Sequence, residues 1–583
     1  MITKSIKLYI LLIAVIFSSS CNKDFLDKQA DDMLTIDQIF ANQVETERYL
    51  RNVYSYLPDE LTPYNTYFGV SDEGDMPWSN MPQNTQMNTG SWSPVAVPFN
   101  DYAPLYRGIR SATVFINRVE ECTACDSKRW AAEARSLRAW YYFLLLRKYG
   151  PVVLVKDLMP VDAQSSELQF PRSSYDECVD YIIQELSVAQ ADLPQKITNS
   201  RDLGKIDSRA VQAMKSRILL YAASPLWNGN ADLAGFKNKD GKQLVNPTYD
   251  SNKWKKAADA AKAVIDIMPE GLYKKNVNNV FDPFVSYRDL FLDRFNYEVI
   301  WARADANSWE LQKHLAPRQL TGWNGMAPTQ MQVDSYYMAN GKMINESGSG
   351  YVENGFSSTG TQYTAPGDWN MYVGREPRFY TSILYNRDIW PFTDEGEVQV
   401  QLYSTGTSGR NGSHDHSETG YLLQKYLSPN SNVRTGQMSM TTYIFFRLAE
   451  MYLNYAEALN EYNPGNPDIK KYIDLIHERA GIPGLPAGLN QAEMRNRIRL
   501  ERRIELAFEN HRVFDTRRWK IAEQTDGGPM WGMNTGAGTS FSDASFYQRT
   551  VFETRVFQSK HYLWPIPQSE MDRNKEMVQN PGW

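Results

Sequence analysis

Cysteine is scarce in this chain: it makes up four of the 583 residues, at positions 21, 122, 125 and 178. So few cysteines exclude a fold held together by several disulfides, and a hydrophobic core must hold it instead. Cys122 and Cys125 have half the spacing of a zinc ribbon, but the second pair that a four-ligand zinc site needs is absent. We therefore expect a local disulfide or free thiols in a loop.

A strong excess of either charge is also missing. The net charge is −6 at pH 7 and the isoelectric point is near 5.7. Because nonspecific binding to nucleic acids needs a basic surface, we expect no nucleic-acid partner. The sequence also lacks a zinc-protease motif, a phosphate-binding glycine loop and a serine nucleophile elbow. His414 and His416 beside Asp415 have no ligand partner at helical spacing, so we expect a polar surface loop there, and neither a metal nor a cofactor.

No apolar run is long enough to cross a bilayer. The run from Leu8 to Phe17 is half of the about 20 residues that a spanning helix needs. Two lysines precede it, and three serines separate it from Cys21. This order is typical of a secretory signal with a lipidated cysteine at the cleavage point. We predict that residues 1–20 are a lipoprotein signal peptide and that Cys21 is the acylated first residue of the mature protein.

Helical periodicity with small residues at intervals predicts an all-α dominated fold. Such spacing lets paired helices approach closely, and we expect irregular tetratricopeptide-like helix pairs as a scaffold, with few short strands. A generic helical bundle is the alternative that the sequence leaves open. The segments predicted to be helical are 129–149, 207–224, 254–267, 443–462 and 467–480.

Two long stretches, 57–104 and about 305–440, are polar and rich in Gly, Ser, Thr and Asn, yet contain many aromatic residues. Stretches this long without obvious secondary structure are usually functional or disordered. Disordered chains are poor in aromatic residues, so we predict that these stretches form a loop-rich ligand-binding region.

The arginine-rich run from Met494 to Lys520 could suggest a nucleic-acid helix, but acidic residues interleave with the arginines. Arg497 and Glu501 have the spacing of a helical ion pair. Apolar residues recur in the same run at helical spacing. We predict a packed helix whose charged face is solvated or paired.

Ten short motifs in order along the chain resemble those of the SusD/RagB family of nutrient-binding outer-membrane lipoproteins of Bacteroidetes. Any one of them is weak, but the ordered set runs from residue 21 to the last residue. The motifs are CNKDFLD at 21–27, RSLRAWYY at 135–142, YGPV at 149–152, RLAE at 447–450, YAEALN at 455–460, IHERAG at 476–481, ERRIELAFE at 501–509, RRW at 517–519, LWPIP at 563–567 and NPGW at 580–583.

This resemblance implies an all-helical tetratricopeptide scaffold that carries a loop-rich ligand face. It also implies a lipid-anchored location at the cell surface, on the outer membrane, and a SusC-like TonB-dependent transporter as partner. We expect one integrated fold, with an N-terminal SusD-like helical region and ligand loop in residues 21–225. A C-terminal RagB/SusD-like region with helix pairs and the middle ligand loops would then occupy residues 226–583.

Tryptophans in both long loops lie among amide side chains, such as the five amides between positions 80 and 88. Sugar rings stack their C–H faces on indoles, while their hydroxyls need amide and carboxylate partners. Burial of these tryptophans in the core of the loops is the alternative. The predicted ligand-binding residues are Trp78, Trp92, Trp309 and Trp323 for stacking, with Asp72 and Glu73 as hydroxyl acceptors.

Glycan capture without chemistry is therefore the function that we expect. An oligopeptide-binding importer subunit of the RagB kind is an alternative, although peptide grooves use fewer stacking aromatics. A surface glycoside hydrolase would need two carboxylates across the scissile bond. Asp72, Glu73 and Asp75 could supply such a pair, but three acids in one loop more often bind hydroxyls or Ca²⁺. We do not expect an enzyme.

Overall fold

The computed structural model describes residues 34–78, 81–160, 162–306, 308–390, 396–411 and 413–583. The predicted signal peptide and Cys21 lie outside these ranges. Within them, no helix is both long enough and apolar enough to cross a membrane.

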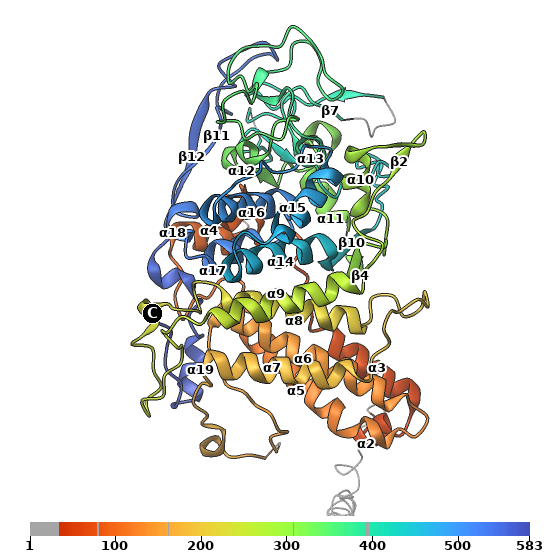
Figure 1. Cartoon of the computed structure of the whole chain (residues 1–583), viewed down its shortest axis with the longest axis vertical. Helices are drawn as coiled ribbons and strands as arrows, with labels where there is room; N and C mark the ends of the chain where they lie inside the picture. Colours follow the sequence, from red (N-terminus) through yellow and green to blue (C-terminus); the bar gives the residue numbers. More distant parts are fainter. Residues whose placement is uncertain (1–33, 79–80, 161, 307, 391–395, 412) are drawn as a thin grey trace, which may run out of the picture.

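A stack of helices in chain order forms the lower half of the molecule in Figure 1. Each helix packs on the next, and α2 (Ile36–Phe40) and α3 (Gln43–Tyr54) close the lower end. The stack consists of α5 (Tyr102–Arg118), α6 (Ser127–Tyr149), α7 (Tyr175–Gln190), α8 (Ser208–Ala223) and α9 (Ser251–Asp266).

Local capping explains where these helices begin. The carboxylates of Asp126, Asp207 and Asp250 each accept a main-chain N–H in the first turn of α6, α8 and α9. Such caps stabilise a helix start by about 1 kcal/mol. The observed bounds agree with the predicted ones within three residues at each end.

The stack continues in the C-terminal half, because α14 (Leu448–Tyr462) packs on α9 although a long insertion separates them in the chain. Helices α15 (Pro467–Ala480) and α16 (Gln491–Glu505) pack on α14 in turn. The bounds of α15 are the predicted ones. The remaining C-terminal helices are α17 (Arg512–Arg518), α18 (Ala522–Thr525) and α19 (Gln568–Arg573).

The predicted start of the 443–462 helix is wrong. Residues 443–447 belong to strand β10 (Thr441–Arg447), which pairs antiparallel with β4 (Val299–Ala306). The β10 segment is threonine, tyrosine, isoleucine and phenylalanine before Arg447, and such β-branched and aromatic residues favour strands.

The insertion between α9 and α14 forms much of the upper half of the molecule (Figure 1). It contains α10 (Pro283–Leu290), α11 (Ser308–Leu315), α12 (Gln330–Ser335) and α13 (Pro377–Ser382). Its two-residue strands are β2 (Asn276–Val277), β3 (Val280–Phe281), β5 (Ala327–Pro328), β6 (Ile383–Leu384), β7 (Ile389–Trp390), β8 (Val398–Gln399) and β9 (Leu422–Leu423).

Every sheet among the described residues has two antiparallel strands. The other long pair is β11 (Gly528–Met533) with β12 (Arg549–Arg555). Helix α4 (Pro82–Thr89) and β1 (Gly74–Asp75) lie in the earlier loop. The all-α dominated class with few short strands is confirmed, and part of each predicted loop has short regular structure.

Buried ion pairs join the insertion to the helix stack. Arg378 of α13 contacts Glu501 at 2.6 Å and Glu505 at 2.9 Å, and Arg447 contacts Glu505 at 2.6 Å. All four side chains are almost completely buried. The charged face of the arginine-rich run is therefore mainly paired inside the protein.

Two details of that run differ from the prediction. The helix is broken between α16 and α17, where Phe508 and Asn510 have positive φ angles of 65° and 61°. Arg497 pairs with Glu346 of the insertion and not with Glu501. Glu501 is instead paired with Arg378 at 2.6 Å and with His477 at 3.0 Å.

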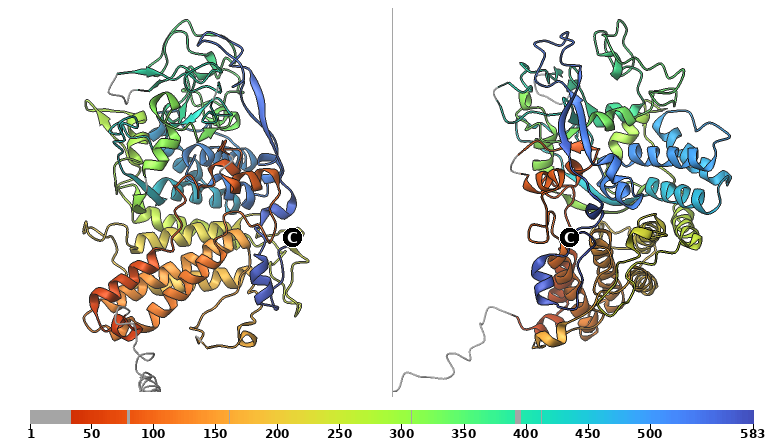
Figure 2. Two further views of the ribbon diagram at one scale, coloured as in Figure 1. Left: turned by 180° about the vertical axis from the view of Figure 1, so that it is seen from behind. Right: turned by 90° about the vertical axis from the view of Figure 1, so that its left-hand side faces the viewer.

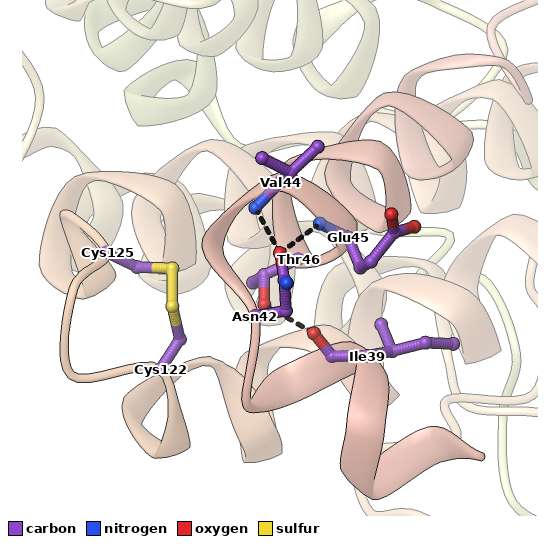
Figure 3. Close-up of a disulfide and its surroundings, with 7 residues drawn as sticks. All are labelled: Ile39, Asn42, Val44, Glu45, Thr46, Cys122 and Cys125. Atoms are coloured by element: carbon purple, nitrogen blue, oxygen red, sulfur yellow. Dashed lines mark hydrogen bonds between the residues drawn. A yellow bond between two sulfur atoms is a disulfide. The ribbon is translucent and has the colours of Figure 1, made fainter. Parts of the chain in front are cut away.

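Cys122 and Cys125 form a disulfide in the turn between α5 and α6 (Figure 3). Beside it, the side chain of Asn42 caps α3 by accepting the main-chain N–H groups of Val44 at 2.9 Å and Glu45 at 3.3 Å. Cys178 is a buried free thiol. Of the two possibilities left open by the sequence, the structure has the local disulfide.

Candidate functional site

A short strand pair brings the early loop and the middle loop together. Strand β1 pairs antiparallel with β5, with Gly74 opposite Pro328 and Asp75 opposite Ala327. Trp78 follows β1 by three residues and Trp323 precedes β5 by four. Because the two strands run antiparallel, the residues that follow β1 lie close to the residues that precede β5. The pairing thus positions the two tryptophans side by side.

The turn that carries Trp323 folds back on the end of α11. The main-chain N–H of Trp323 donates to the carbonyl oxygen of Lys313 at 2.7 Å, and that of Gly325 donates to the carbonyl oxygen of His314 at 2.7 Å. The last carbonyls of a helix have no partner within it, so these bonds both cap α11 and fix the turn. Lys313 Nζ adds a bond to the carbonyl oxygen of Thr321 at 2.9 Å.

Three of the four predicted tryptophans form one cluster. The ring centroid of Trp323 lies 5.8 Å from that of Trp78 and 5.4 Å from that of Trp309. His314 lies in the middle, 4.6 Å from Trp78 and 5.0 Å from Trp323. Tyr64 extends the cluster, 6.0 Å from His314. We call these five side chains the aromatic cluster.

The aromatic cluster is partly open to solvent. Trp309 is 44% exposed and Tyr64 41%, while Trp78 and Trp323 are half-buried. Burial lowers the pKa of His314 to about 4, although a bond to the carbonyl oxygen of Glu310 opposes this. The imidazole is therefore neutral at pH 7, and the cluster presents uncharged ring faces.

A cavity of about 620 Å³ lies beside the aromatic cluster and shares Trp78 with it. This volume is within the range of small-molecule sites. One part of its lining is residues 75–78 with α4, and another is residues 550–553 of β12. Arg410, Glu418 and residues 534–536 complete it.

Three buried polar atoms of the cavity lining have no hydrogen-bond partner in the described part of the chain: Trp78 Nε1, Asn84 Oδ1 and Asp75 Oδ2. An unpaired buried polar atom costs about 1–3 kcal/mol, and a ligand that pairs with it recovers part of that cost. Trp78 Nε1 is a donor and Asn84 Oδ1 an acceptor, and Asp75 Oδ2 accepts when its carboxyl group is ionised. A hydroxyl group, which both donates and accepts, suits all three.

Asp75 differs from an ordinary surface carboxylate. Burial raises its pKa to about 7, and the nearby Arg555, 3.6 Å away, opposes that rise only in part. Near neutral pH the carboxyl group of Asp75 is therefore present in both protonated and ionised forms.

The structure places Trp92 in the core, and its predicted role in stacking on a ligand does not fit this placement. Trp92 is 3% exposed, with its ring 4.9 Å from His561, 5.5 Å from Trp564 and 4.9 Å from Trp583. The C-terminal segment covers the indole because it packs against the early loop. We exclude Trp92 from the candidate site.

Asp72 and Glu73 are also buried, which corrects their predicted role as hydroxyl acceptors. Both carboxylate oxygens of Asp72 accept from Arg512, at 2.7 and 2.8 Å, and Arg503 lies 2.9 Å away. Glu73 accepts the main-chain N–H of Phe508 at 2.6 Å. Because their oxygens bind α16, α17 and the turn between them, these residues hold the loop of β1 in place.

Sequence reasoning missed several residues of the aromatic cluster and of the cavity lining. Tyr64 and His314 join the aromatic cluster only through contacts between distant segments. Glu418, Glu553 and residues 534–536 reach the cavity from parts of the chain far from Trp78. The only available signal was the amide-rich stretch before Trp92, which contains Asn84 and Asn88.

No group of three histidine, cysteine, aspartate or glutamate side chains that could hold a metal ion occurs in the described ranges. His416 Nε2 lies 3.0 Å from Glu418 Oε1, and the side chain of His414 is 89% exposed.

Two family models match the chain: "SusD family" over residues 295–583, and "Starch-binding associating with outer membrane" over residues 24–220. SusD-like protein P2 of Formosa agariphila is 35% identical over 25% of this chain, and the match spans only 27% of that protein. Starch-binding protein SusD of Bacteroides thetaiotaomicron is 23% identical over a stretch that covers 90% of this chain and 85% of that protein. The solved structure of BT4246 has a TM-score of 0.82 at 26% identity, covering 93% of this chain and all of that one.

Proposed function

Because the chain belongs to the SusD/RagB family, we propose that it is a glycan-binding lipoprotein of the cell surface. In this proposal it captures oligo- or polysaccharide and delivers it to a SusC-like TonB-dependent transporter in the outer membrane, without chemistry on the glycan. Starch is named for one relative and outer-membrane association for one family model. Both properties come to this chain only as part of the proposal.

One observation supports glycan binding above all: Trp78 belongs both to the aromatic cluster and to the lining of the cavity. Indole faces bind the apolar faces of sugar rings, and the unpartnered atoms of Asp75 and Asn84 suit their hydroxyls. Stacking and hydrogen bonding are thus available to one ligand. The proposed ligand-binding residues are now Trp78, Trp309, Trp323, Asp75 and Asn84.

The second candidate is an oligopeptide-binding subunit. Strand β12 lines the cavity and is paired on one side only, with β11, among the described strands. An extended peptide can add to such an edge through main-chain hydrogen bonds. That mode does not use the aromatic cluster, which is why we favour a glycan.

Binding of the mature protein to a panel of polysaccharides and to peptide mixtures tests the proposal. Calorimetry on the best polysaccharide would then compare Trp78→Ala, Trp309→Ala and Trp323→Ala. Each loss of a stacking face should weaken binding about tenfold. Thermal unfolding of each variant separates a binding effect from a loss of folding.

Trp92→Ala is the matched control for stability. Removal of this buried indole should lower the unfolding free energy by about 3–5 kcal/mol. Unchanged glycan binding in all three cluster variants would contradict the proposed site. Binding of peptides and of no polysaccharide would favour the second candidate. Reducing-end assays on the bound glycan should detect no cleavage.

The proposed delivery step needs its own experiment. Detergent extraction and affinity purification of the tagged protein should recover an outer-membrane barrel with it. Recovery of the protein alone, in cells that express a neighbouring barrel, would count against the partnership.

A further inference from the structure

The β11–β12 hairpin carries an exposed apolar pair. Trp531 lies directly opposite Val551 in the register of the two strands. Directly opposite residues of an antiparallel pair point to the same face. Trp531 is 40% exposed and Val551 44%, so together they form an apolar surface, which we call the hairpin platform.

Alternation along β11 directs Trp531 outward, and a register shift places Val551 opposite it. The shift falls between Met530, which is opposite Glu553, and Trp531, and it leaves Phe552 as an extra residue on β12. Met530 is only 1% exposed. Since successive side chains of a strand alternate between faces, a buried Met530 places the next side chain on the outer face. Figures 1 and 2 show the hairpin along the surface of the molecule, on the side where α4 lies.

The main chain of the hairpin platform is well fixed. Trp531 is paired with β12 on one side, and its N–H donates to Met331 Sδ of α12 at 3.5 Å. A stacking surface on a rigid element loses little conformational freedom when it binds a ligand.

The hairpin platform is continuous with the cavity. Val551 lines the cavity together with Phe552, while Trp78 lines it as part of the aromatic cluster. Val551 and Trp78 therefore face one open cavity, and Trp531 adjoins it through its register partner Val551. The same lining includes the polar side chains of Asp75 and Asn84.

We propose that the hairpin platform is a second sugar-stacking surface, so that the protein binds a long oligosaccharide that reaches from the aromatic cluster through the cavity to Trp531. This inference rests on the proposed function. The site then selects for chain length: short oligosaccharides fill the aromatic cluster and the cavity, and only longer ones gain the contact with Trp531.

Chain-length dependence tests the inference. The protein is first tested on affinity gels that contain soluble starch, laminarin, xylan, galactomannan or dextran. Oligosaccharides of increasing length, prepared from the polysaccharide that retards it most, are then titrated into the wild type, Trp531→Ala, Trp531→Tyr and Trp323→Ala. Tyr249→Ala is the control, because Tyr249 is 55% exposed and belongs to neither surface.

For the longest oligosaccharide, Trp531→Ala should weaken binding about tenfold, with binding of the trisaccharide unchanged. Trp531→Tyr should recover part of the loss, and Trp323→Ala should weaken binding at every length. Equal affinity of wild type and Trp531→Ala at every length would overturn the inference and leave the proposed function standing. If no polysaccharide of the panel retards the wild type, the proposed function fails for these glycans and the inference fails with it.

Discussion

At the residue scale, the adjacent carboxyl groups of Asp72 and Glu73 have pKa values shifted in opposite directions. Burial disfavours the ionised form of Asp72, but the charges of Arg503 and Arg512 outweigh it and lower the pKa to about 2. Burial dominates for Glu73 and raises its pKa to about 7, because its partner is mainly a main-chain N–H. Phe508 and Arg512, which bind Glu73 and Asp72 respectively, lie more than 400 residues away in the chain.

Asp72→Asn should therefore change the acid dependence of stability. Since the folded pKa of Asp72 is depressed, its ion pairs contribute stability above pH about 4, and this contribution is lost as the pH falls through about 2. The variant should lose about 3 kcal/mol of unfolding free energy at pH 7, because Arg503 and Arg512 lose their buried partner. Denaturant unfolding at pH 7 and along an acid series measures both effects.

The control for that substitution is Asp180→Asn, at an exposed position. It should leave the unfolding free energy within about 0.5 kcal/mol of the wild type. An acid series in which Asp72→Asn parallels the wild type would contradict the role assigned to the ion pairs.

At the element scale, the β1–β5 pair and the turn after α11 assemble the site. Within that turn Gly325 lies against the rings, because a Cβ there would lie 2.6 Å from His314 and 3.3 Å from Trp78. The absence of a side chain lets the main chain pass beside the rings. The site thus depends on the close approach of the main chain at Gly325 to these rings, as well as on the aromatic residues themselves.

Gly325→Ala should displace the rings of His314 and Trp78 and weaken glycan binding severalfold. Gly235→Ala is the matched control, since no atom lies within 4 Å of the Cβ it would add. Calorimetry on the best polysaccharide ligand measures the effect, and tryptophan fluorescence reports the displaced indole. Binding equal to that of the control variant would show that the rings tolerate the methyl group.

A second prediction at the element scale concerns the disulfide in the turn between α5 and α6. It closes a loop of four residues, for which loss of the cross-link should cost about 2 kcal/mol. The Cys122→Ser/Cys125→Ser double variant should unfold at a lower temperature than the oxidised wild type. Reduction of the wild type should give the same shift. A melting temperature that does not respond to either change would exclude a stabilising role.

At the scale of the whole molecule, the helix stack separates the N-terminal end from the candidate site. Helix α2 lies at the lower end, while the insertion and the β11–β12 hairpin form the upper part (Figure 1). A lipid attached ahead of α2 could thus anchor the protein without covering the aromatic cluster or the cavity.

Cys21→Ser should release the protein from membranes. This prediction depends on the charged, apolar and small-residue order before Cys21, since the acyl chains would supply the membrane affinity. Cell fractionation in a strain without the partner barrel measures it, so that binding to the barrel does not retain the protein. Continued recovery of the variant with the outer membrane would contradict lipid anchoring.

Local pattern predicted the helices well. The bounds of α15 and, within three residues, those of α6, α8 and α9 follow from periodicity and from caps encoded within each segment. The start of α14 was wrong because residues 443–447 are buried as a strand against β4, a distant segment. Three of the six predicted ligand-binding residues lie together in the aromatic cluster, and the other three are buried.

The sequence by itself determined the helical class, the helix scaffold and the family, because these depend on local periodicity and on ordered motifs. Only the tertiary structure decided which tryptophans can meet a ligand. Trp92 and Trp531 are the same residue type, yet one is covered by His561, Trp564 and Trp583 and the other is exposed opposite Val551. The exposure of a side chain depends on which distant segments pack over it, and no local pattern encodes that.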